Sequence, residues 1–356
     1  MVQKNSAWIG TRSKPKNIFI SKAVTLFQPF VFSTNMTFNK SIFLAIFSTC
    51  ILISACSKED IDYNCNEWTT VCADTAITID QTKSNRKVLI IGIDGFRADA
   101  MQQSLSPFMY AFAQNEYTYF TDKNHVQELT FSGPNWGSLC TGVDFCKHMV
   151  TTNDFDGNRL DEFPHFFKYI EQANQQKNTV SIVNWTPINE DLASPFADYV
   201  PTESITDNDV FVIAKELLNQ GNPLTPDLLF LQFDELDITG HDYGFNPDVP
   251  EYANYLTTLD GYVDSLVSII EEKRLNGEEW LICIISDHGG DGKSHGGKYD
   301  NENVRHTIMY LNSPNETFKQ WYTSSQTDLA PTVLDYLGVE SAEFNCKTDG
   351  ISVIED

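Results

Sequence analysis

The stretch Lys87–Asp94, "KVLIIGID", is a short, continuous apolar run that ends in an aspartate. A run of this length without helical spacing is typical of a strand that is buried on both faces of a sheet. Similar runs recur at "TVSIVNW" (Thr179–Trp185), "DLLFLQFDELD" (Asp227–Asp237), "WLICIISD" (Trp280–Asp287) and "RHTIMYLN" (Arg305–Asn312).

Helical patterns lie between or after these runs, at Glu162–Gln175, Asp207–Asn219, Tyr252–Lys273 and Thr327–Leu337. Strands that alternate with helices predict an α/β sandwich, in which helices flank a mostly parallel central sheet. In such sheets, ligands bind beyond the carboxyl ends of the strands.

Acidic residues stand at three of those ends, since the first, third and fourth runs finish in Asp94, Asp237 and Asp287. One aspartate at such a place is most often a helix cap or a turn residue. Three of them would converge on one edge of the sheet, and two are followed by histidines at short spacing. This pattern indicates a cation site.

The histidines lie in two glycine-containing fragments. In "DITGH", His241 follows Asp237 by four residues, and in "SDHGGDGKSHGG" (Ser286–Gly297) His288 and His295 follow Asp287. Carboxylates and neutral imidazoles are a ligand set that suits zinc. Asp291, in the same loop, is read as a solvated acid outside the site.

A hydroxyl stands before another predicted helix, in "TFSGPNWGSLCTG" (Thr130–Gly142). Ser132 there would face unpaired amides and the positive end of the helix dipole, which favour an anion. Read alone, Ser132 is better explained as a helix cap. Thr130 is a second hydroxyl nearby and an alternative to Ser132.

Taken in order, these fragments resemble the alkaline phosphatase superfamily, most closely its type I phosphodiesterase/nucleotide pyrophosphatase branch. The resemblance runs from about Val88 to Gly338. It rests on "IDGFR" (Ile93–Arg97), "SGPNWGSLCTG", "DITGH", "SDHGG", "SHGG" and "TDLAPTVLDYLG" (Thr327–Gly338). It implies an alkaline-phosphatase-like three-layer sandwich and a two-zinc hydrolase.

The resemblance also implies residue roles. The first zinc would be held by Asp94, Ser132, Asp287 and His288, and the second by Asp237, His241 and His295. Ser132 would attack phosphorus and form a covalent phospho-serine, and Asn135 would contact a phosphoryl oxygen. His306 competes with His295 as a ligand, but it lies in a strand pattern.

Composition narrows the substrate. The formal net charge of −25 disfavours nucleic-acid binding, so a small phosphoester is expected. Trp136 stands where sulfatases carry an arginine, which disfavours that class. The scarcity of arginines between the first ligand and "DITGH", only Arg97 and Arg159, favours a phosphodiester or pyrophosphate. The alternatives are a phosphomonoesterase of the same fold and a non-catalytic surface binding lipoprotein.

Aromatic side chains give a weaker hint about the substrate. Phe131, Trp136 and Tyr243 could stack on a base or sugar. In such numbers, aromatic side chains more often belong to the core or to the rim of a site.

The first 55 residues hold six basic and no acidic side chains. From Met36, a lysine, an apolar run and "LISAC" resemble a lipoprotein signal peptide, with lipid attached at Cys56. The expected organisation is therefore an N-terminal extension (1–35), a signal peptide (36–55), a polar tether (56–86) and one catalytic domain (87–356). The expected location is the bacterial cell envelope, with the protein lipid-anchored at the periplasmic face or the cell surface.

Six cysteines follow Cys56, and an even number in an exported protein permits disulfides. Cys65–Cys72 and Cys140–Cys146 are the shortest loops to close, although six cysteines allow 15 pairings. Cys283, inside an apolar run, is expected to be a buried thiol.

Overall fold

The computed structural model describes residues 65, 68–73, 76–194, 196–219 and 225–355. The strands are β1 Thr78–Ile79, β2 Lys87–Ile93, β3 Thr118–His125, β4 Thr179–Val183, β5 Leu228–Phe233, β6 Trp280–Ile285, β7 His306–Asn312 and β8 Val339–Glu340. The helices are α1 Pro107–Phe112, α2 Ser132–Thr141, α3 Phe145–His148, α4 Phe167–Ala173, α5 Asp207–Leu218, α6 Glu235–Tyr243, α7 Pro250–Leu275, α8 Glu302–Arg305, α9 Leu329–Tyr336 and α10 Ala342–Lys347.

A six-stranded sheet forms the centre of the fold, in the order β3-β7-β6-β2-β5-β4. The β4–β5, β5–β2 and β2–β6 pairs are parallel, whereas β7 runs antiparallel to both β6 and β3. Successive residues of a strand face opposite sides of its sheet. In β2, Val88 and Ile90 therefore enter one core and Leu89 and Ile91 the other, and all four are fully buried.

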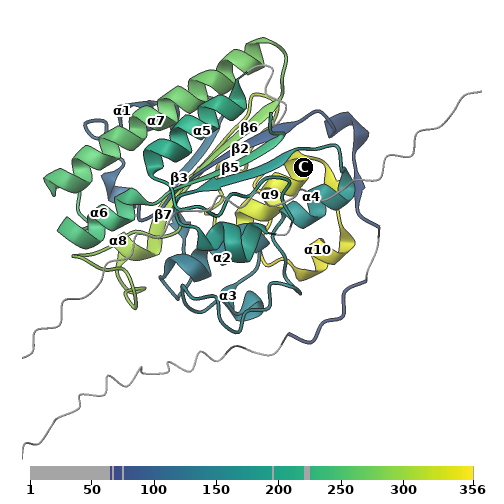
Figure 1. Ribbon diagram of the computed structural model, residues 1–356, viewed down its shortest axis with the longest axis horizontal. Helices are drawn as coiled ribbons and strands as arrows, with labels where there is room; N and C mark the ends of the chain where they lie inside the picture. Colours follow the sequence, from purple (N-terminus) through teal and green to yellow (C-terminus); the bar gives the residue numbers. More distant parts are fainter. Residues whose placement is uncertain (1–64, 66–67, 74–75, 195, 220–224, 356) are drawn as a thin grey trace, which may run out of the picture. The chain divides into compact units, whose positions relative to one another are not determined.

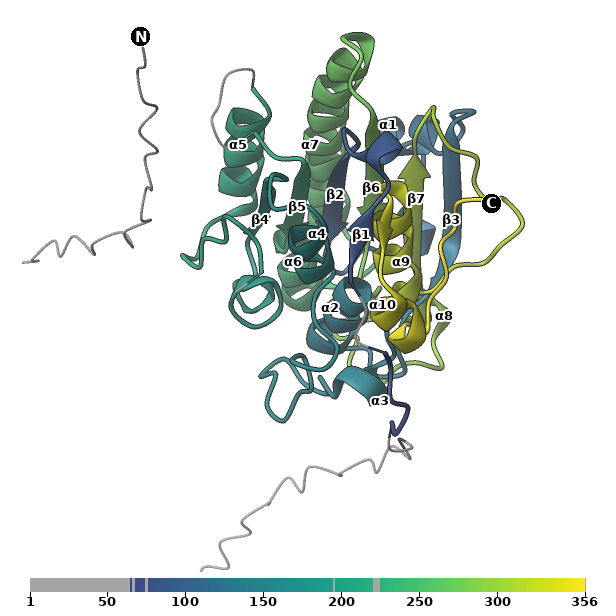
Figure 2. The ribbon, with the colours of Figure 1, turned by 90° about the vertical axis from the view of Figure 1, so that its right-hand side faces the viewer.

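Helices cover both faces of this sheet (Figure 1). Helices α1, α5 and α7 pack over the face that holds Leu89, while α2, α4 and α9 pack over the face that holds Val88. Figure 2 shows α4 and α9 on one side of the strands and α7 on the other. The structure confirms the three-layer sandwich with a mostly parallel sheet. All four predicted helices are present as α4, α5, α7 and α9.

Two elements differ from the sequence prediction. The edge strand β3 was missed because its second half, "TDKNH", is polar and lacks an apolar run. The predicted strand Asp227–Asp237 stops at Phe233, and α6 follows it. The Asp207 carboxylate accepts from the backbone N–H groups of Asp234 and Glu235 and so caps the start of α6. Asp237 consequently lies in the first turn of a helix, not at the end of a strand.

The described part of the predicted tether is bound to the domain. Cys65 forms a disulfide with Cys146 and Cys72 with Cys346, and β1 pairs with β8. A tether over residues 56–86 is therefore too long. The extension, the signal peptide and Cys56 lie outside the described residues. Within the described part of the chain, no helix is both long and apolar enough to cross a membrane.

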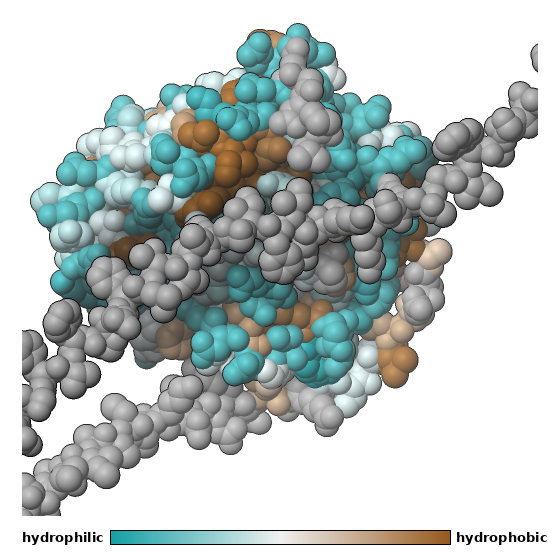
Figure 3. Space-filling model, in the orientation of Figure 1, coloured by the Kyte–Doolittle hydropathy of each residue, from teal (hydrophilic) through white to brown (hydrophobic). Residues whose placement is uncertain are grey.

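The two local disulfides expected from spacing are wrong. Cys140 is a fully buried thiol in α2, whereas Cys146 lies on α3 and reaches Cys65. Rigid helices thus separate two cysteines that are only six residues apart. Cys283 is a buried free thiol, as expected. The face of the molecule in Figure 3 is mostly hydrophilic, with a continuous apolar area in its upper half and smaller apolar areas below.

Candidate metal centre

Two groups of metal-ligating side chains lie at the carboxyl edge of the parallel strands. The first comprises Asp94, Asp287 and His288, and the second Asp237, His241 and His295. Asp94 follows β2, and Asp287 and His288 follow β6; these three side chains are fully buried. The structure thus brings together all six histidines and carboxylates predicted as ligands.

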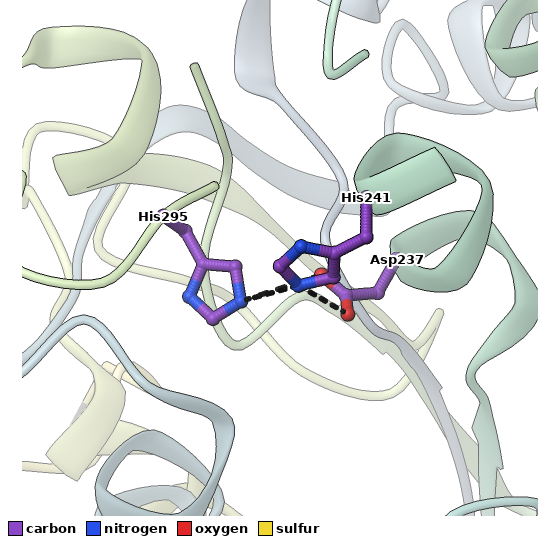
Figure 4. A group of neighbouring side chains, drawn as sticks. All are labelled: Asp237, His241 and His295. Carbon is purple, nitrogen blue, oxygen red and sulfur yellow. Dashed lines mark hydrogen bonds and ion pairs between the residues drawn. The ribbon is translucent and has the colours of Figure 1, made fainter. Parts of the chain in front are cut away.

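Helix α6 and the loop after β6 supply the second group (Figure 4). Asp237 and His241 are four residues apart, so they share one face of α6. His295 approaches them from the glycine-rich loop. Gly95, which follows Asp94, has a φ of +71° and lies against Asp237. A Cβ at this position would lie 2.9 Å from the Cα of Asp237, so a glycine here lets the two segments approach each other.

All three imidazoles present the same nitrogen to the centre. The Nδ1 atoms of His288, His241 and His295 lie 2.9, 3.0 and 2.5 Å from the backbone carbonyls of Gly289, Lys293 and Thr130. A carbonyl can only accept, so Nδ1 carries the proton and Nε2 of the neutral ring holds a free lone pair. A hydrogen bond from Nδ1–H, the ring nitrogen turned away from the metal, is the arrangement that orients metal-binding histidines.

Three carboxylate oxygens in the centre are buried without a hydrogen-bond partner: Asp94 Oδ1, Asp287 Oδ2 and Asp237 Oδ1. A buried anionic oxygen left unpaired is strongly unfavourable. Each of these oxygens faces an imidazole nitrogen, at 3.5, 3.2 and 3.7 Å respectively. Cations between these atoms would satisfy them, so the donor set fits two metal ions.

The spacing of the donors also fits zinc. Ligands at 2.0–2.1 Å from a tetrahedral zinc are about 3.3 Å from one another. In the first group, Asp287 Oδ2 lies 3.2 Å from His288 Nε2. In the second, His241 Nε2 lies 3.3 Å from Asp237 Oδ2 and 3.1 Å from His295 Nε2. The groups adjoin, because the rings of His288 and His295 stack with centroids 3.7 Å apart.

Burial and like charge set the electrostatics of the first group. Burial, together with neighbouring carboxylates, raises the pKa of Asp94 and of Asp287 well above the usual range. Burial lowers the pKa of His288 to about 3. Without a cation the carboxyls therefore retain protons, and a bound metal has to displace them.

The second group is more exposed, and His241 Nε2 lies 3.3 Å from Asp237 Oδ2. A hydrogen bond that the His241 imidazole donates to the Asp237 carboxylate raises the pKa of His241. Burial alone would raise the pKa of Asp237. The hydrogen bond with His241 and the nearby imidazoles nevertheless hold the pKa of that carboxyl below its usual value. Burial lowers the pKa of His295.

Ser132 is the hydroxyl at the centre. Its Oγ lies 3.2 Å from His288 Nε2, at the first residue of α2. Thr130 is fully buried, and its Oγ1 donates to the backbone carbonyl of His295 at 2.6 Å. The geometry therefore places the Ser132 hydroxyl beside the metal-ligating groups, whereas the Thr130 hydroxyl holds the backbone of His295.

Asn135 does not lie where a phosphoryl contact requires. It is fully buried, and its Oδ1 accepts from Gln127 N while its Nδ2 donates to the carbonyls of Leu129 and Phe131. Both amide protons are used, so none is left for a phosphoryl oxygen. Asn135 instead braces the segment that leads into Ser132.

Asn153 is a candidate that sequence reasoning missed. Its exposed side chain accepts from the backbone N–H of Gly133 at 2.8 Å, which holds the amide beside Ser132. Its Nδ2 makes no hydrogen bond among the described residues. No motif marks this residue, because it lies in a polar loop 21 positions after Ser132.

Other predicted residues fall outside the centre. His306 starts β7, where its ring contacts that of His125, and it joins neither group. Trp136 is fully buried and cannot stack on a substrate. Phe131 and Tyr243 are exposed, and Phe131 contacts His295 edge to face at 6.3 Å between centroids.

Comparison with known proteins agrees with this geometry. Residues 88–299 match the model of the family "Type I phosphodiesterase / nucleotide pyrophosphatase". Over 220 residues the chain is 26% identical to bis(5'-adenosyl)-triphosphatase ENPP4 of Bos taurus, which covers 57% of this chain and 47% of that protein. It is 21% identical over 334 residues to GPI ethanolamine phosphate transferase 2 of Saccharomyces cerevisiae, covering 83% and 37%. The chain thus spans about half or less of the length of these relatives.

Solved structures share the fold. Murine ectonucleotide pyrophosphatase/phosphodiesterase 5 superposes with a TM-score of 0.54 at 16% identity, covering 72% of this chain and 96% of that one. The C-terminal periplasmic domain of phosphoethanolamine transferase EptC from Campylobacter jejuni gives 0.53 at 16% identity, covering 73% and 91%. The fold is that of the alkaline phosphatase superfamily, and with more than half of its residues in the family match, the chain belongs to the type I phosphodiesterase/nucleotide pyrophosphatase family.

Proposed function

We propose that the protein is a two-zinc hydrolase that cleaves phosphodiester or pyrophosphate bonds of small substrates. One observation carries the proposal. Three unpaired carboxylate oxygens and three Nε2 lone pairs converge beside the Ser132 hydroxyl, at the start of a helix. The hydroxyl among these donors supports a hydrolytic metal centre over a structural one.

Two bound zinc ions would lower the pKa of the serine and of a water and would stabilise the attacking and leaving oxygens. Ser132 Oγ would form a bond to phosphorus as the bond to the leaving oxygen breaks. Water would then attack the phospho-serine, and Ser132 Oγ would leave and regain its proton. The ester and one water are thereby converted to a phosphate product and an alcohol.

The start of α2 would hold the phosphoryl oxygens. The N-cap residue, Phe131, makes no side-chain cap there, so the positive end of the helix faces the centre. The Asn153 amide, fixed by Gly133, would donate to a phosphoryl oxygen. This role replaces the one expected for Asn135.

The charge of the site favours a diester over a monoester. Arg97 is buried, and its guanidinium donates to Asp99 and to the backbone carbonyl of Phe245. Arg159 pairs with Glu162. Neither arginine is free for the second charge of a phosphomonoester. The names of the relatives, a triphosphatase and ethanolamine phosphate transferases, and a solved AMP complex of the murine family member 5 support small phosphoesters.

The test uses the chain from Ser57 onward, with zinc. We expect bis-p-nitrophenyl phosphate to be hydrolysed faster than p-nitrophenyl phosphate, and Ser132→Ala to abolish both reactions without loss of zinc stoichiometry. Ser138→Ala is the matched control, because Ser138 lies in the same helix and contacts His148. A faster monoester rate would move the substrate class, and inactivity of the wild type with two bound zinc ions would favour the binding-protein alternative.

We also propose that the protein is exported and lipid-anchored at Cys56 in the bacterial envelope. The two disulfides support export, since such bonds persist in oxidising compartments. Mass spectrometry of the membrane-bound protein should find acylated Cys56 at its N-terminus. Release of a Cys56→Ala variant into the soluble fraction would agree, and an unchanged membrane fraction would contradict the anchor.

A further inference from the structure

Trp136 donates a hydrogen bond into the first group. Its indole Nε1 lies 2.9 Å from Asp94 Oδ2, and Gln232 Nε2 lies 3.2 Å from the same oxygen. Both donors are fully buried. The other oxygen, Asp94 Oδ1, has no hydrogen-bond partner and faces His288 Nε2 at 3.5 Å. One carboxylate oxygen is therefore held and the other is left for a cation.

The sequence makes room for this indole. Gly92 lies two residues before Asp94 on β2, and a Cβ at Gly92 would be 2.4 Å from Trp136 Cη2 and 2.9 Å from Cζ3. On β5, Phe230 packs edge to face against the indole with centroids 6.0 Å apart. Real Cβ atoms do not approach so closely, so a larger residue at Gly92 would displace the indole.

We propose that Trp136, assisted by Gln232, is a positioning residue that orients Asp94 for the first metal ion. The proposal rests on the two-zinc function above. Both donors are uncharged, so they hold the carboxylate without supplying a competing cation. Loss of the indole N–H would leave Gln232 as the single side-chain donor to this oxygen, so the Asp94 carboxylate would rotate more easily. Such outer contacts typically change metal affinity by 10–100-fold.

Helix α2 gives this contact a second consequence. Trp136 follows Ser132 by four residues, about one helical turn, so both side chains lie on the face of α2 that meets the centre. The same helix therefore carries the proposed nucleophile and the donor to Asp94. The indole fixes the position of the nucleophile relative to the metal ligand.

Trp136→Phe tests the proposal, because it retains a buried aromatic ring and removes the N–H donor together with part of the indole, a loss of volume that the control shares. Trp280→Phe is the matched control: Trp280 is also fully buried, and its Nε1 donates to a carboxylate, Glu278 Oε2, at 3.0 Å. That bond lies at the opposite end of the sheet, where β6 begins. Zinc is titrated by equilibrium dialysis against a competing chelator, with metal counted by mass spectrometry.

We expect the wild type and Trp280→Phe each to bind two zinc ions. Each of the two affinities should be the same in both proteins. Trp136→Phe should bind one of the two 10–100-fold more weakly. Zinc should also change the tryptophan fluorescence of wild type and Trp280→Phe but not of Trp136→Phe. Two wild-type affinities in Trp136→Phe would overturn the positioning role, whereas fewer than two zinc ions in the wild type would overturn the proposed metal centre instead.

A second variant protects the test against misfolding. Gln232→Met keeps the length of the side chain and removes the second donor to Asp94. It is read in the same titration, where it should weaken the same single site. If Gln232→Met folds and binds both ions as the wild type does, the proposal that these donors orient Asp94 is refuted.

Discussion

Replacing Cys72 and Cys346 by alanine should destabilise the protein by several kcal/mol. The disulfide between them closes a loop with a sequence separation of 274 residues. The loop-entropy relation assigns such a loop about 5.6 kcal/mol at 25 °C. The bond from Cys65 to Cys146 shortens the effective loop to roughly 200 residues, which lowers that figure only to about 5.3 kcal/mol. Since measured effects usually fall below the relation, we expect a loss of about 3–5 kcal/mol.

The assay is guanidinium unfolding of the chain from Ser57 onward, followed by tryptophan fluorescence in the presence of EDTA. Removing metal avoids stabilisation by bound ligand, which would differ between variants. The single variants Cys72→Ala and Cys346→Ala are the controls. If the bond is the source of stability, each single variant should equal the double variant to within about 0.5 kcal/mol.

Two results would refute this reasoning. Wild-type stability in the double variant would show that the bond contributes nothing. Wild-type stability in Cys346→Ala alone would show that Cys72 pairs elsewhere, as in the local pairing expected from spacing. Thiol counting gives an independent check, since only the buried Cys140 and Cys283 should react, and only after unfolding.

Three further predictions concern the metal centre. The increase in melting temperature that zinc produces should become larger as pH rises from about 6 to 8. Zinc must displace the proton that His241 retains because of its raised pKa, and the protons of the buried carboxyls, and fewer of these protons remain at higher pH. An increase that does not depend on pH, measured by scanning calorimetry, would contradict this. Thr130→Val should weaken one zinc site about tenfold by releasing His295, whereas Thr130→Ser should not; equal zinc titrations of the two variants would refute the role. Asn153→Ala should lower kcat/KM about 10²–10³-fold and leave the stability unchanged. Asn135→Ala should mainly lower the stability, by about 2–3 kcal/mol. The reverse pattern in kinetics and denaturant unfolding would restore the role first expected of Asn135.

The sequence was sufficient to predict those elements whose structure is determined by burial alone. Strands buried on both faces, such as β2 and β6, are continuous apolar runs, and a sequence shows these directly. Edge strand β3 has one solvated side, so its polar residues conceal it. The start of α6 depends on the carboxylate of Asp207, which lies 30 residues before Asp237, and no local pattern reports a cap supplied from so far away.

The centre was readable to the extent that its residues sit in short glycine-containing motifs. Those motifs located every carboxylate and imidazole of the two groups. The roles of Asn135 and Asn153 were not readable, because both are asparagines near Ser132 and only the hydrogen bonds separate them. Trp136 looked like a surface for a substrate base, and only its burial against Gly92 shows that it faces Asp94.

The pairing of β1 with β8 sets Thr78 opposite Glu340, close to the bond that joins Cys72 to Cys346. The segments 72–79 and 339–346 are therefore tied to each other by a covalent bond and a β-ladder. A pulling force applied to the chain outside these segments would pass through that bond, so the sheet between them would stay folded until the bond is reduced.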